Sequence, residues 1–574
     1  MAQADQHPAT NTIVATNFLI TNPVAYCTIL LAHRTRKGYA VPMTVELVSC
    51  CYEKGNFSFP LGVLCIKEAL ASHHIPSKVQ NWYLSDDPEE AAASVHADIV
   101  GLSVYLWNRK WFDLFATKVK RDNPGTILFA GGTEVTANPH SFDLDSYRFL
   151  VIGEGEESVP YALEAILQGK EITPTRGIVV KGSVFSCGCP EDLSTLPSVF
   201  LSHTADPFLK REDTVLWELT RGCPYHCAFC FESKGVRSVR RFPTERIVAE
   251  LQYLTSHDVH DVFVLDPTFN MDKRRTVTIL NLLSEKAPGI HFTFENRAEL
   301  LNEEIVDSYG KLNCSLQLGM QSSNPEVLRT IDRAADMQAF EKGVRLLGKE
   351  GVSFGLDVII GLPKDTLEGF CKSIDYAISM KPNNIDIFLL SLLPGTTLAD
   401  RADALGLVYE KQNPYHLIES PTFSRIDIQK ALDIKKATDF FYTKGQAFQW
   451  FSLFQNAAEL PAHTLMLLFS SFLARCQREP DVYEAQDMFV RSILKQQNKT
   501  ALLPALTSYM ELYQGIAYLL ETGESPVVEL QYDPNDLAHL ECMPLDRFAK
   551  ETKRRRCALA VVQENDGTIG FVDQ

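Results

Sequence analysis

Residues 221–230 read Arg-Gly-Cys-Pro-Tyr-His-Cys-Ala-Phe-Cys, and three of these ten residues are cysteines. Its cysteines, Cys223, Cys227 and Cys230, are spaced C-x3-C-x2-C directly after a predicted strand. Three thiolates this close together can hold three irons of a cubane cluster and leave the fourth iron open for a ligand. The alternative is a zinc knuckle closed by His226 or a distant cysteine. Zinc sites usually come as paired C-x-x-C motifs, and no second pair lies nearby.

Apolar strand patterns alternate with helical patterns from this stretch onward. The expected strands span 215–220, 261–266, 291–296, 315–319, 353–361 and 385–390. Six strands of this kind, with helices between them, predict a full or partial (β/α) barrel over residues 213–414. In such barrels the active site lies at the carboxyl ends of the strands, which is where the cysteines stand.

An earlier alternation of the same kind occupies residues 44–175. Its expected strands span 45–51, 78–84, 98–105, 126–131 and 149–153. Short apolar strands separated by helices indicate a parallel sheet covered on both faces, here in a doubly wound, flavodoxin-like domain. Residues 176–212 are expected to form a hairpin, with arms 177–180 and 184–186, and a linker.

The two ends of the chain show weaker patterns. Residues 1–43 have no sustained period and are an N-terminal extension of unassigned role. Residues 415–574 are helical in pattern, with a small β-rich cap that holds expected strands at 527–532 and 558–562. The predicted fold class is therefore α/β, with a flavodoxin-like (Rossmann-like) domain, a partial (β/α)6 barrel and a mostly helical C-terminal domain.

The cysteine motif in this setting resembles the radical S-adenosylmethionine (radical SAM) superfamily. Later strand ends add to the resemblance at 265–270, 295–297, 319–322, 360–366 and 393–396, so that it covers about 214–400. The resemblance implies a [4Fe-4S] cluster on Cys223, Cys227 and Cys230. It also implies that the open iron chelates the amino and carboxylate groups of S-adenosylmethionine (SAM), whose reductive cleavage yields a 5'-deoxyadenosyl radical.

The same resemblance suggests which side chains contact SAM. The candidates are Asp266, Glu295, Arg297, Gln321 and Arg333. Arg297 and Arg333 are placed against the methionine carboxylate, because a guanidinium grips a carboxylate through two hydrogen bonds; a surface salt bridge is the alternative for each. Glu295 and Gln321 are assigned to the ribose or sulfonium side. The aspartate and Asn270 have the alternative role of capping the next helix.

Residues 44–170 resemble the cobalamin-binding domain that precedes the barrel in one large branch of this superfamily. The candidate contact residues stand at strand ends: Gly101, Ser103, Tyr105, Gly131, Gly132, Thr133, Gly153, Glu154 and Gly155. Glycines there let the backbone approach a flat or phosphate-bearing ligand, although any doubly wound domain has glycine-rich turns. The first strand lacks the Asp-x-His-x-x-Gly segment that supplies an axial histidine in many cobalamin domains. We therefore expect cobalamin without a protein imidazole, and a small or apolar residue of 103–107 facing the cobalt.

The combination implies cobalamin-dependent methyl transfer to an unactivated carbon. In the mechanism of the family, one SAM methylates the cobalt and a second yields the radical that removes a substrate hydrogen. The alternative is a radical rearrangement, cyclisation or oxidation without methyl transfer, with a structural N-terminal domain. A non-catalytic corrinoid or metal sensor is a third hypothesis. The C-terminal region is expected to close the open side of the barrel and shape the pocket.

Composition limits which kinds of partner and which cellular location are expected. The 574 residues carry a net charge of -17, which argues against nucleic acid because phosphate binding needs a basic surface. No apolar run is long enough for a membrane span, and no signal peptide is expected. We expect a cytoplasmic protein whose 14 cysteines are buried thiols or metal ligands. The expected partners are a small-molecule or biosynthetic-intermediate substrate and an electron-donor protein such as flavodoxin or ferredoxin.

Overall fold

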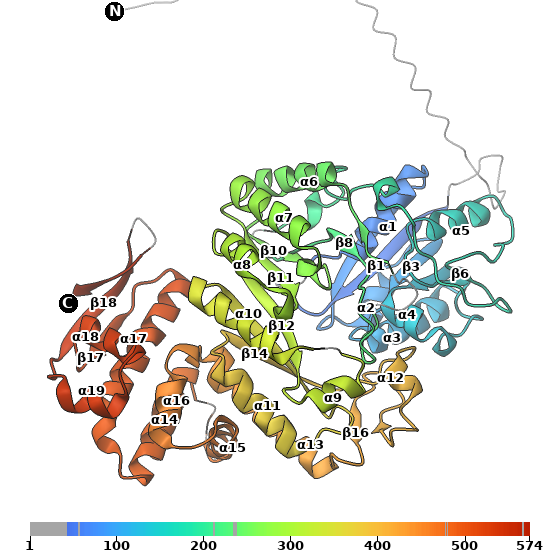
Figure 1. The fold of residues 1–574 in the computed structure, drawn as a ribbon. Helices are drawn as coiled ribbons and strands as arrows, with labels where there is room; N and C mark the ends of the chain where they lie inside the picture. Colours follow the sequence, from blue (N-terminus) through green and yellow to red (C-terminus); the bar gives the residue numbers. More distant parts are fainter. Residues whose placement is uncertain are drawn as a thin grey trace, which may run out of the picture.

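The computed structural model places three regions side by side, with the barrel in the middle (Figure 1). It describes residues 43–55, 58–210, 213–232, 238–333, 335–476, 478, 480–564 and 568–574. The expected N-terminal extension therefore lies outside the described residues, apart from Met43. The flavodoxin-like domain and the C-terminal region lie on opposite sides of the barrel.

The N-terminal domain is a six-stranded sheet covered on both faces. Its strands are β1 (Val45–Cys51), β2 (Ser77–Tyr83), β3 (Ile99–Ser103), β4 (Ile127–Gly131), β5 (Phe149–Val151) and β6 (Ile178–Val179). Its helices are α1 (Leu61–Ser72), α2 (Pro88–Ala93), α3 (Arg109–Asp122), α4 (Thr133–Ala137) and α5 (Ser158–Leu167). The order β2-β1-β3-β4-β5, all parallel, is the flavodoxin-like order. Two apolar cores, one on each face, confirm that the strands are buried on both sides.

The expected hairpin is wrong in one arm. Residues 184–186 do not form a strand, and β6 pairs antiparallel with β5 instead. The reason is that β5 would otherwise be a bare edge, whose free N–H and C=O groups β6 satisfies. Two backbone hydrogen bonds close the turn, from Gly177 N–H to the Ser186 carbonyl and from Ser183 N–H to the Val180 carbonyl.

The central region is an open, all-parallel sheet of six strands. The strands are β7 (Val215–Trp217), β10 (Asp261–Val264), β11 (His291–Asn296), β12 (Cys314–Gln321), β13 (Ser353–Ile360) and β14 (Asn384–Leu389), in the order β14-β13-β12-β11-β10-β7. The helices are α6 (Thr244–Ser256), α7 (Lys273–Lys286), α8 (Glu303–Tyr309), α9 (Pro325–Thr330), α10 (Met337–Glu350), α11 (Leu367–Ser379) and α12 (Thr397–Asp400). Because β7 and β14 are the two ends of this order, the barrel is partial rather than full.

The C-terminal region is helical and ends in a small antiparallel sheet. Its helices are α13 (Arg425–Thr438), α14 (Phe451–Ala458), α15 (Ala462–Leu473), α16 (Val482–Gln496), α17 (Leu503–Thr522), α18 (Pro534–Leu537) and α19 (Leu545–Glu551). The sheet contains β17 (Val527–Leu530), β18 (Cys557–Gln563) and β19 (Ile569–Asp573). None of the described helices has the length and apolar character needed to cross a membrane.

A π-helical turn after α13 covers the free edge of β14. This turn spans Asp439–Lys444. The Ile385 N–H donates to Thr443 Oγ1 at 3.1 Å, and the Tyr442 hydroxyl donates to the Pro382 carbonyl at 3.0 Å. The C-terminal region therefore packs against the open side of the barrel through side-chain hydrogen bonds to the edge strand.

Candidate cofactor site between the N-terminal domain and the barrel

The three motif cysteines lie at the carboxyl end of the barrel, between β8 (Thr220–Arg221) and β9 (Arg240–Arg241). Cys223 and Cys227 are each 9% exposed, and Cys230 is half-buried. Burial raises the pKa of the Cys223 thiol. Burial and the nearby negative charges, those of the other two cysteines among them, raise the pKa of Cys230 to about 12. Only thiolates ligate metal, so binding of a cluster must displace these protons.

The cysteine loop, residues 222–232, is anchored to two other barrel loops. The Ala228 N–H donates to the Ile331 carbonyl at 2.8 Å, and the Leu398 N–H donates to the Ala228 carbonyl at 2.8 Å. Ile331 directly follows α9, and Leu398 lies in α12, so both partners come later in the barrel than the cysteine loop. The loop is therefore positioned by the barrel itself, which is how a precise metal site is supported.

Arg333 lies beside the cysteine loop and keeps an unused donor. Its Nη1 is 3.8 Å from Cys227 Sγ, and its Nη2 donates to the Gly319 carbonyl. Its Nε is buried and has no hydrogen-bond partner among the described residues. Gln321, at φ +67°, folds back over Gly319 so closely that a Cβ there would lie 2.5 Å from the Gln321 amide nitrogen. A buried donor without a partner is costly, so this corner is suited to an anionic ligand group.

Arg297 has its charge paired. Its Nη2 lies 2.6 Å from Glu299 Oε1, and its guanidinium carbon is 3.9 Å from the centre of the Tyr225 ring on the cysteine loop. Its backbone is held by Asn270, which accepts from the Arg297 N–H at 3.0 Å and donates to the Arg297 carbonyl at 2.8 Å. The side chain is 6% exposed, so this ion pair is not the surface salt bridge that was the alternative.

Asp266 and Asn270 do not cap the next helix, so that alternative is wrong. The cap of α7 is Asp272. Asp266 Oδ1 instead accepts hydrogen bonds from the Leu219 and Thr220 N–H groups, at 2.9 and 2.8 Å, and so braces the strand that leads into the cysteine loop. Asp266 is 2% exposed, and this burial raises its pKa to about 6.

The substitution Asp266→Asn should change how stability depends on pH. The folded-state pKa lies above the ordinary value of 3.8, so ionisation is penalised in the fold. The stability that the protonated form contributes is complete below about pH 4 and is lost as the pH rises through 6. Asparagine keeps an acceptor for the two N–H groups without the charge. We expect the variant to gain up to about 3 kcal/mol on the wild type between pH 4 and pH 8. Thermal unfolding across this range checks the result, and parallel curves would contradict it.

Glu295, on β11, keeps an exposed side chain and lies near Asp357 and Glu232. Partial removal from bulk water, followed by these two negative charges, raises the pKa of Glu295 to about 7. Asp357 itself has a pKa raised to about 6 by burial, and it accepts a hydrogen bond from Gln317. This part of the barrel therefore holds carboxyl groups that take up protons near neutral pH.

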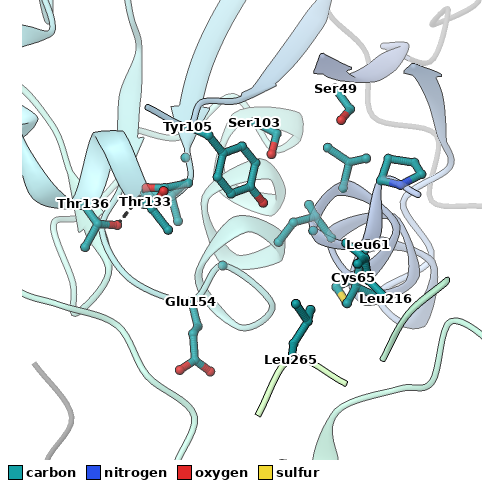
Figure 2. Close-up of a pocket in the computed structure, with 18 of the residues that line it drawn as sticks. Ser49, Leu61, Cys65, Ser103, Tyr105, Thr133, Thr136, Glu154, Leu216 and Leu265 are labelled. Carbon is teal, nitrogen blue, oxygen red and sulfur yellow. Dashed lines mark hydrogen bonds between the residues drawn. The ribbon is translucent and has the colours of Figure 1, made fainter. Parts of the chain in front are cut away.

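A cavity of about 780 Å³ lies between the carboxyl ends of the two sheets (Figure 2). All nine residues expected at the cobalamin site line it: Gly101, Ser103, Tyr105, Gly131, Gly132, Thr133, Gly153, Glu154 and Gly155. Helix α1 contributes Leu61 and Cys65, and the barrel contributes Leu216, Leu265 and the start of the cysteine loop at Gly222. No described residue beyond Pro267 lines this cavity, so the C-terminal region does not shape it. One space therefore touches both the sheet edge and the cysteine loop.

Two of the glycines in the cavity wall are required by the fold. Gly132 has φ +108°, and a Cβ there would lie 2.4 Å from the Val104 carbonyl oxygen. Gly153 has φ +89°, and a Cβ there would lie 2.1 Å from the Gly188 carbonyl oxygen. Larger residues are thus excluded by neighbouring backbone as well as by any ligand, so these glycines keep the strand ends open.

Tyr105 projects into the cavity and is stacked on Trp107. The two rings are 4.5 Å apart at an angle of 8°, and Trp107 is 48% exposed. Burial raises the pKa of Tyr105, so its ring presents a neutral face to the cavity. The described lining residues include no histidine.

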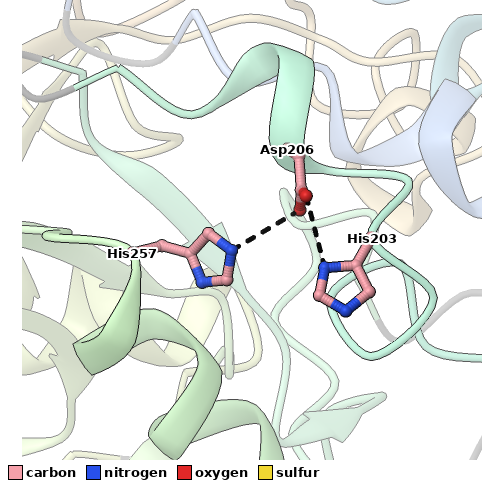
Figure 3. A group of neighbouring side chains, drawn as sticks. All are labelled: His203, Asp206 and His257. Carbon is pink, nitrogen blue, oxygen red and sulfur yellow. Dashed lines mark hydrogen bonds and ion pairs between the residues drawn. The ribbon is translucent and has the colours of Figure 1, made fainter. Parts of the chain in front are cut away.

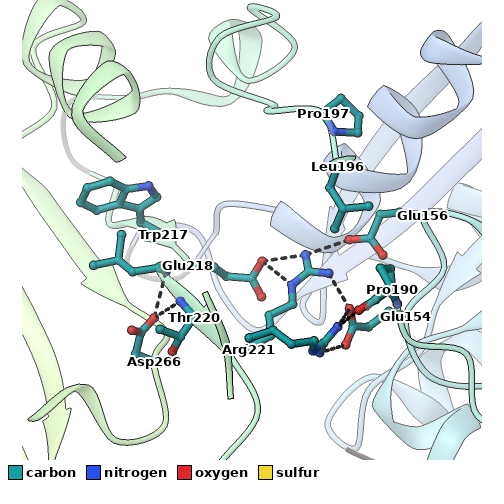
Figure 4. A network of polar contacts seen from close by, with 12 residues as sticks. Glu154, Glu156, Pro190, Leu196, Pro197, Trp217, Glu218, Thr220, Arg221 and Asp266 are labelled. Atoms are coloured by element: carbon teal, nitrogen blue, oxygen red, sulfur yellow. Dashed lines mark hydrogen bonds and ion pairs between the residues drawn. The ribbon is translucent and has the colours of Figure 1, made fainter. Parts of the chain in front are cut away.

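A network of ion pairs joins the two halves of the cavity wall (Figure 4). Arg221, two positions before Cys223, contacts Glu154, Glu156 and Glu218, each at 2.8 Å. Arg240 also pairs with Glu154. Burial alone would raise the pKa of Glu154, but the two arginines more than offset this and hold it below its usual value. Glu154 therefore lines the cavity as a paired carboxylate that links the N-terminal domain to the cysteine loop.

Sequence reasoning missed a second joint between the same regions. The Tyr415 hydroxyl donates to Glu134 Oε1 at 2.6 Å and accepts from Asn138 Nδ2 at 3.1 Å. Asn413 donates to the Leu106 carbonyl from the same loop. These partners are about 280 to 300 positions apart in the chain, so no local pattern could have paired them.

Comparison with known proteins accounts for both halves of the site. A family model described as the Radical SAM superfamily matches residues 217–377, and one described as the B12 binding domain matches residues 53–163. Two segments of the chain therefore match known domains, a radical SAM domain and, before it, a B12-binding domain. These domains specify a [4Fe-4S] cluster, SAM and cobalamin as cofactors. The described residues fit them, through three thiols on one anchored loop, a free buried donor on Arg333, and a cavity at the strand ends.

The relatives are similar over part of their length. The 2-(S-pantetheinyl)-carbapenam-3-carboxylate methyltransferase of Streptantibioticus cattleyicolor is 28% identical over 342 residues, which are 55% of this chain and 50% of that protein. The cobalamin-dependent radical SAM methyltransferase TokK of Streptomyces tokunonensis is 27% identical, over 54% of this chain and 49% of that protein. The chain thus spans about half the length of these relatives. The structure of the cobalamin-dependent SAM radical enzyme OxsB with aqua-cobalamin bound shares the fold, with a TM-score of 0.55, 14% identity, and coverage of 89% of this chain and 85% of that one.

Proposed function

We propose that this protein is a cobalamin-dependent radical SAM methyltransferase that acts on an unactivated carbon of a small molecule. The observation that carries the proposal is the shared cavity, whose wall contains both the B12-domain strand ends and the start of the cysteine loop. A methyl carrier and a radical source can serve one substrate only if they face a common space. The methyltransferase names of both curated relatives support the same reading.

The residues of the chain would bind, orient and shield. When bound, the cluster and SAM supply a carbon radical and cobalamin supplies a methyl carrier. Cys223, Cys227 and Cys230 would hold the cluster, and Arg333 would bind the SAM carboxylate through its free Nε. The apolar wall, including Leu216 and Leu265, would exclude water from a reactive centre.

The products of SAM distinguish this function from its alternative. Methyl transfer consumes SAM in two ways, so reconstituted, reduced protein should form S-adenosylhomocysteine as well as 5'-deoxyadenosine, and a substrate should gain the mass of CH2. Formation of 5'-deoxyadenosine alone, with no mass gain, would replace the proposal with a radical rearrangement, cyclisation or oxidation. Absence of both products would leave a non-catalytic sensor.

The substitution Arg333→Gln should weaken SAM binding. A charge-assisted hydrogen bond contributes about 1.5–3 kcal/mol, so Kd should rise about 10- to 150-fold. Equilibrium binding of SAM to protein with its cluster oxidised measures the effect. Arg345→Gln is the matched control, because Arg345 is 78% exposed and pairs with Glu341 on the surface of α10. Equal affinities in the two variants would show that Arg333 serves only the cysteine loop.

We further propose that a flavodoxin- or ferredoxin-like protein delivers the electron and that the protein works in the cytoplasm. A low-potential cluster needs a reductant of this class, and thiols such as those of Cys223 and Cys227 stay reduced there. Purified flavodoxin with its reductase should support 5'-deoxyadenosine formation in place of a chemical reductant. Failure of several such carriers would argue for a different donor.

A further inference from the structure

Two histidines and an aspartate meet on the outer surface, away from the cavity. His203 and Asp206 belong to the segment 198–208 that leads from the N-terminal domain to the barrel, and His257 follows α6 (Figure 3). His203 Nδ1 is 3.2 Å from Asp206 Oδ2, and His257 Nε2 is 3.8 Å from Asp206 Oδ1. One potential ligand atom from each residue lies within 4.8 Å of the other two. None of the three lines the cavity.

These separations suit a tetrahedral metal ion. Zinc binds imidazole nitrogen and carboxylate oxygen at about 2.0–2.2 Å, which places neighbouring ligand atoms about 3.3 Å apart. His203 Nδ1 and His257 Nε2 lie 3.2 and 3.8 Å from the two different oxygens of Asp206, close to this value, and one ligand atom of each residue lies within 4.8 Å of the others. Small side-chain movements would therefore bring the three atoms into one coordination sphere, with water as a fourth ligand.

The surrounding groups orient His257 as a ligand. Its Nδ1 is 2.9 Å from the Tyr253 carbonyl oxygen, which can only accept, so Nδ1 carries the proton and Nε2 presents a lone pair towards Asp206. Metal-binding histidines usually donate their second ring N–H to such a carbonyl. The Tyr253 ring stacks on His257 at 3.9 Å, and its hydroxyl donates to Asp206 Oδ1. Two of the three side chains are thus held in place by contacts with Tyr253.

The site is accessible to solvent. The side chains of His203, Asp206 and His257 are 64%, 42% and 30% exposed. An N/N/O donor set of this kind suits zinc and related transition metals, whereas Ca²⁺ and Mg²⁺ require more oxygen ligands.

We propose that His203, Asp206 and His257 form a zinc site that clamps the interdomain segment 198–208 onto α6. This segment already connects the two regions, since Thr204 donates to Glu68 on α1 at 2.5 Å and Ser198 donates to Glu250 on α6 at 2.5 Å. A bound ion would add a cross-link at the same junction. It would fix the N-terminal domain relative to the barrel without taking part in the chemistry of the cavity.

Zinc binding to the reconstituted protein tests the proposal, with the motif cysteines occupied by iron. After chelator treatment that leaves the iron content unchanged, competition with a chromophoric chelator should give one zinc per chain. His203→Asn keeps a residue that tolerates the positive φ of 64°, and His257→Phe keeps the ring on Tyr253. Each should weaken binding by more than about 100-fold, since even outer contacts of metal ligands are worth 10- to 100-fold.

His73→Asn is the matched control, because His73 is exposed and lies 2.8 Å from a single carboxylate, that of Glu164. It should bind zinc like the wild type. Zinc should also raise the melting temperature of the wild type and of this control, but not that of His203→Asn. Equal zinc binding by all variants, no stoichiometric binding by the wild type, or binding without any rise in melting temperature would each overturn the proposed clamp.

Discussion

Replacing Cys223 with alanine is expected to stop the formation of 5'-deoxyadenosine. Cys223 is 9% exposed and is one of three thiols on the cysteine loop. This loop is anchored through hydrogen bonds of the Ala228 N–H and the Ala228 carbonyl. A cubane cluster held by two thiolates loses a ligand that no neighbouring group replaces in kind. Because changes to outer contacts of a metal site already cost 10- to 100-fold, loss of a direct ligand should lower the rate by more than about 100-fold.

Iron content, the electron paramagnetic resonance spectrum of the reduced protein and the yield of 5'-deoxyadenosine measure this effect together. Cys227→Ala and Cys230→Ala should behave in the same way. Cys542→Ala is the control, since that cysteine is exposed in the C-terminal region and should leave all three readouts unchanged. Full turnover by Cys223→Ala would refute the assignment of the cluster to this loop.

Replacing Arg221 with methionine should destabilise the protein strongly and loosen the cobalamin domain. Arg221 is 11% exposed in its side chain and contacts three carboxylates, two of them from the N-terminal domain. Methionine preserves much of the volume but leaves Glu156, 8% exposed, without this partner. Removing one partner from a buried ion pair typically costs about 3–5 kcal/mol. Denaturant unfolding should show this loss, and gel filtration should show reduced retention of added cobalamin.

Two comparisons test whether the loss of stability in Arg221→Met comes from the ion-pair network. Arg547→Met removes an arginine that is 61% exposed and pairs with Glu551 one helical turn away, so it should cost less than about 0.5 kcal/mol. Adding Glu156→Gln to Arg221→Met should restore part of the stability, because it removes the carboxylate that has lost its partner, whereas Glu154 keeps its pair with Arg240. If Arg221→Met and Arg547→Met cost the same, the network does not hold the domains together.

The sequence was sufficient for most of the fold because buried parallel strands are nearly continuous apolar runs. The patterns at 261–266, 291–296 and 353–361 correspond to β10, β11 and β13. Whether the barrel is open or closed could not be predicted from these patterns, since closure depends on whether the first and last strands meet. The strand β19 was not predicted because most of its residues are exposed and it has no apolar face of its own.

The cavity residues were predictable for a related reason. Carboxyl ends of neighbouring parallel strands meet at one edge, so glycines and hydroxyl residues at several strand ends must converge. Their partners were not predictable. The pairing of Arg221 with Glu154 joins residues 67 positions apart, and that of Tyr415 with Glu134 joins residues 281 apart. The position of Arg221 beside Cys223 was the one local signal, and it did not indicate which carboxylates it would meet.

The π-helical turn over β14 has a consequence for any shortened form of the protein. An uncovered edge strand is a template onto which a strand of another molecule can add, and this is a common start of aggregation. Here a single threonine hydroxyl occupies the Ile385 amide, and α13 follows β14 by way of a short two-stranded ribbon, β15 (Val408–Tyr409) and β16 (Leu417–Glu419). We therefore expect the C-terminal region to protect this edge from self-association. A barrel separated from it would expose the edge of β14, and we expect such a fragment to aggregate.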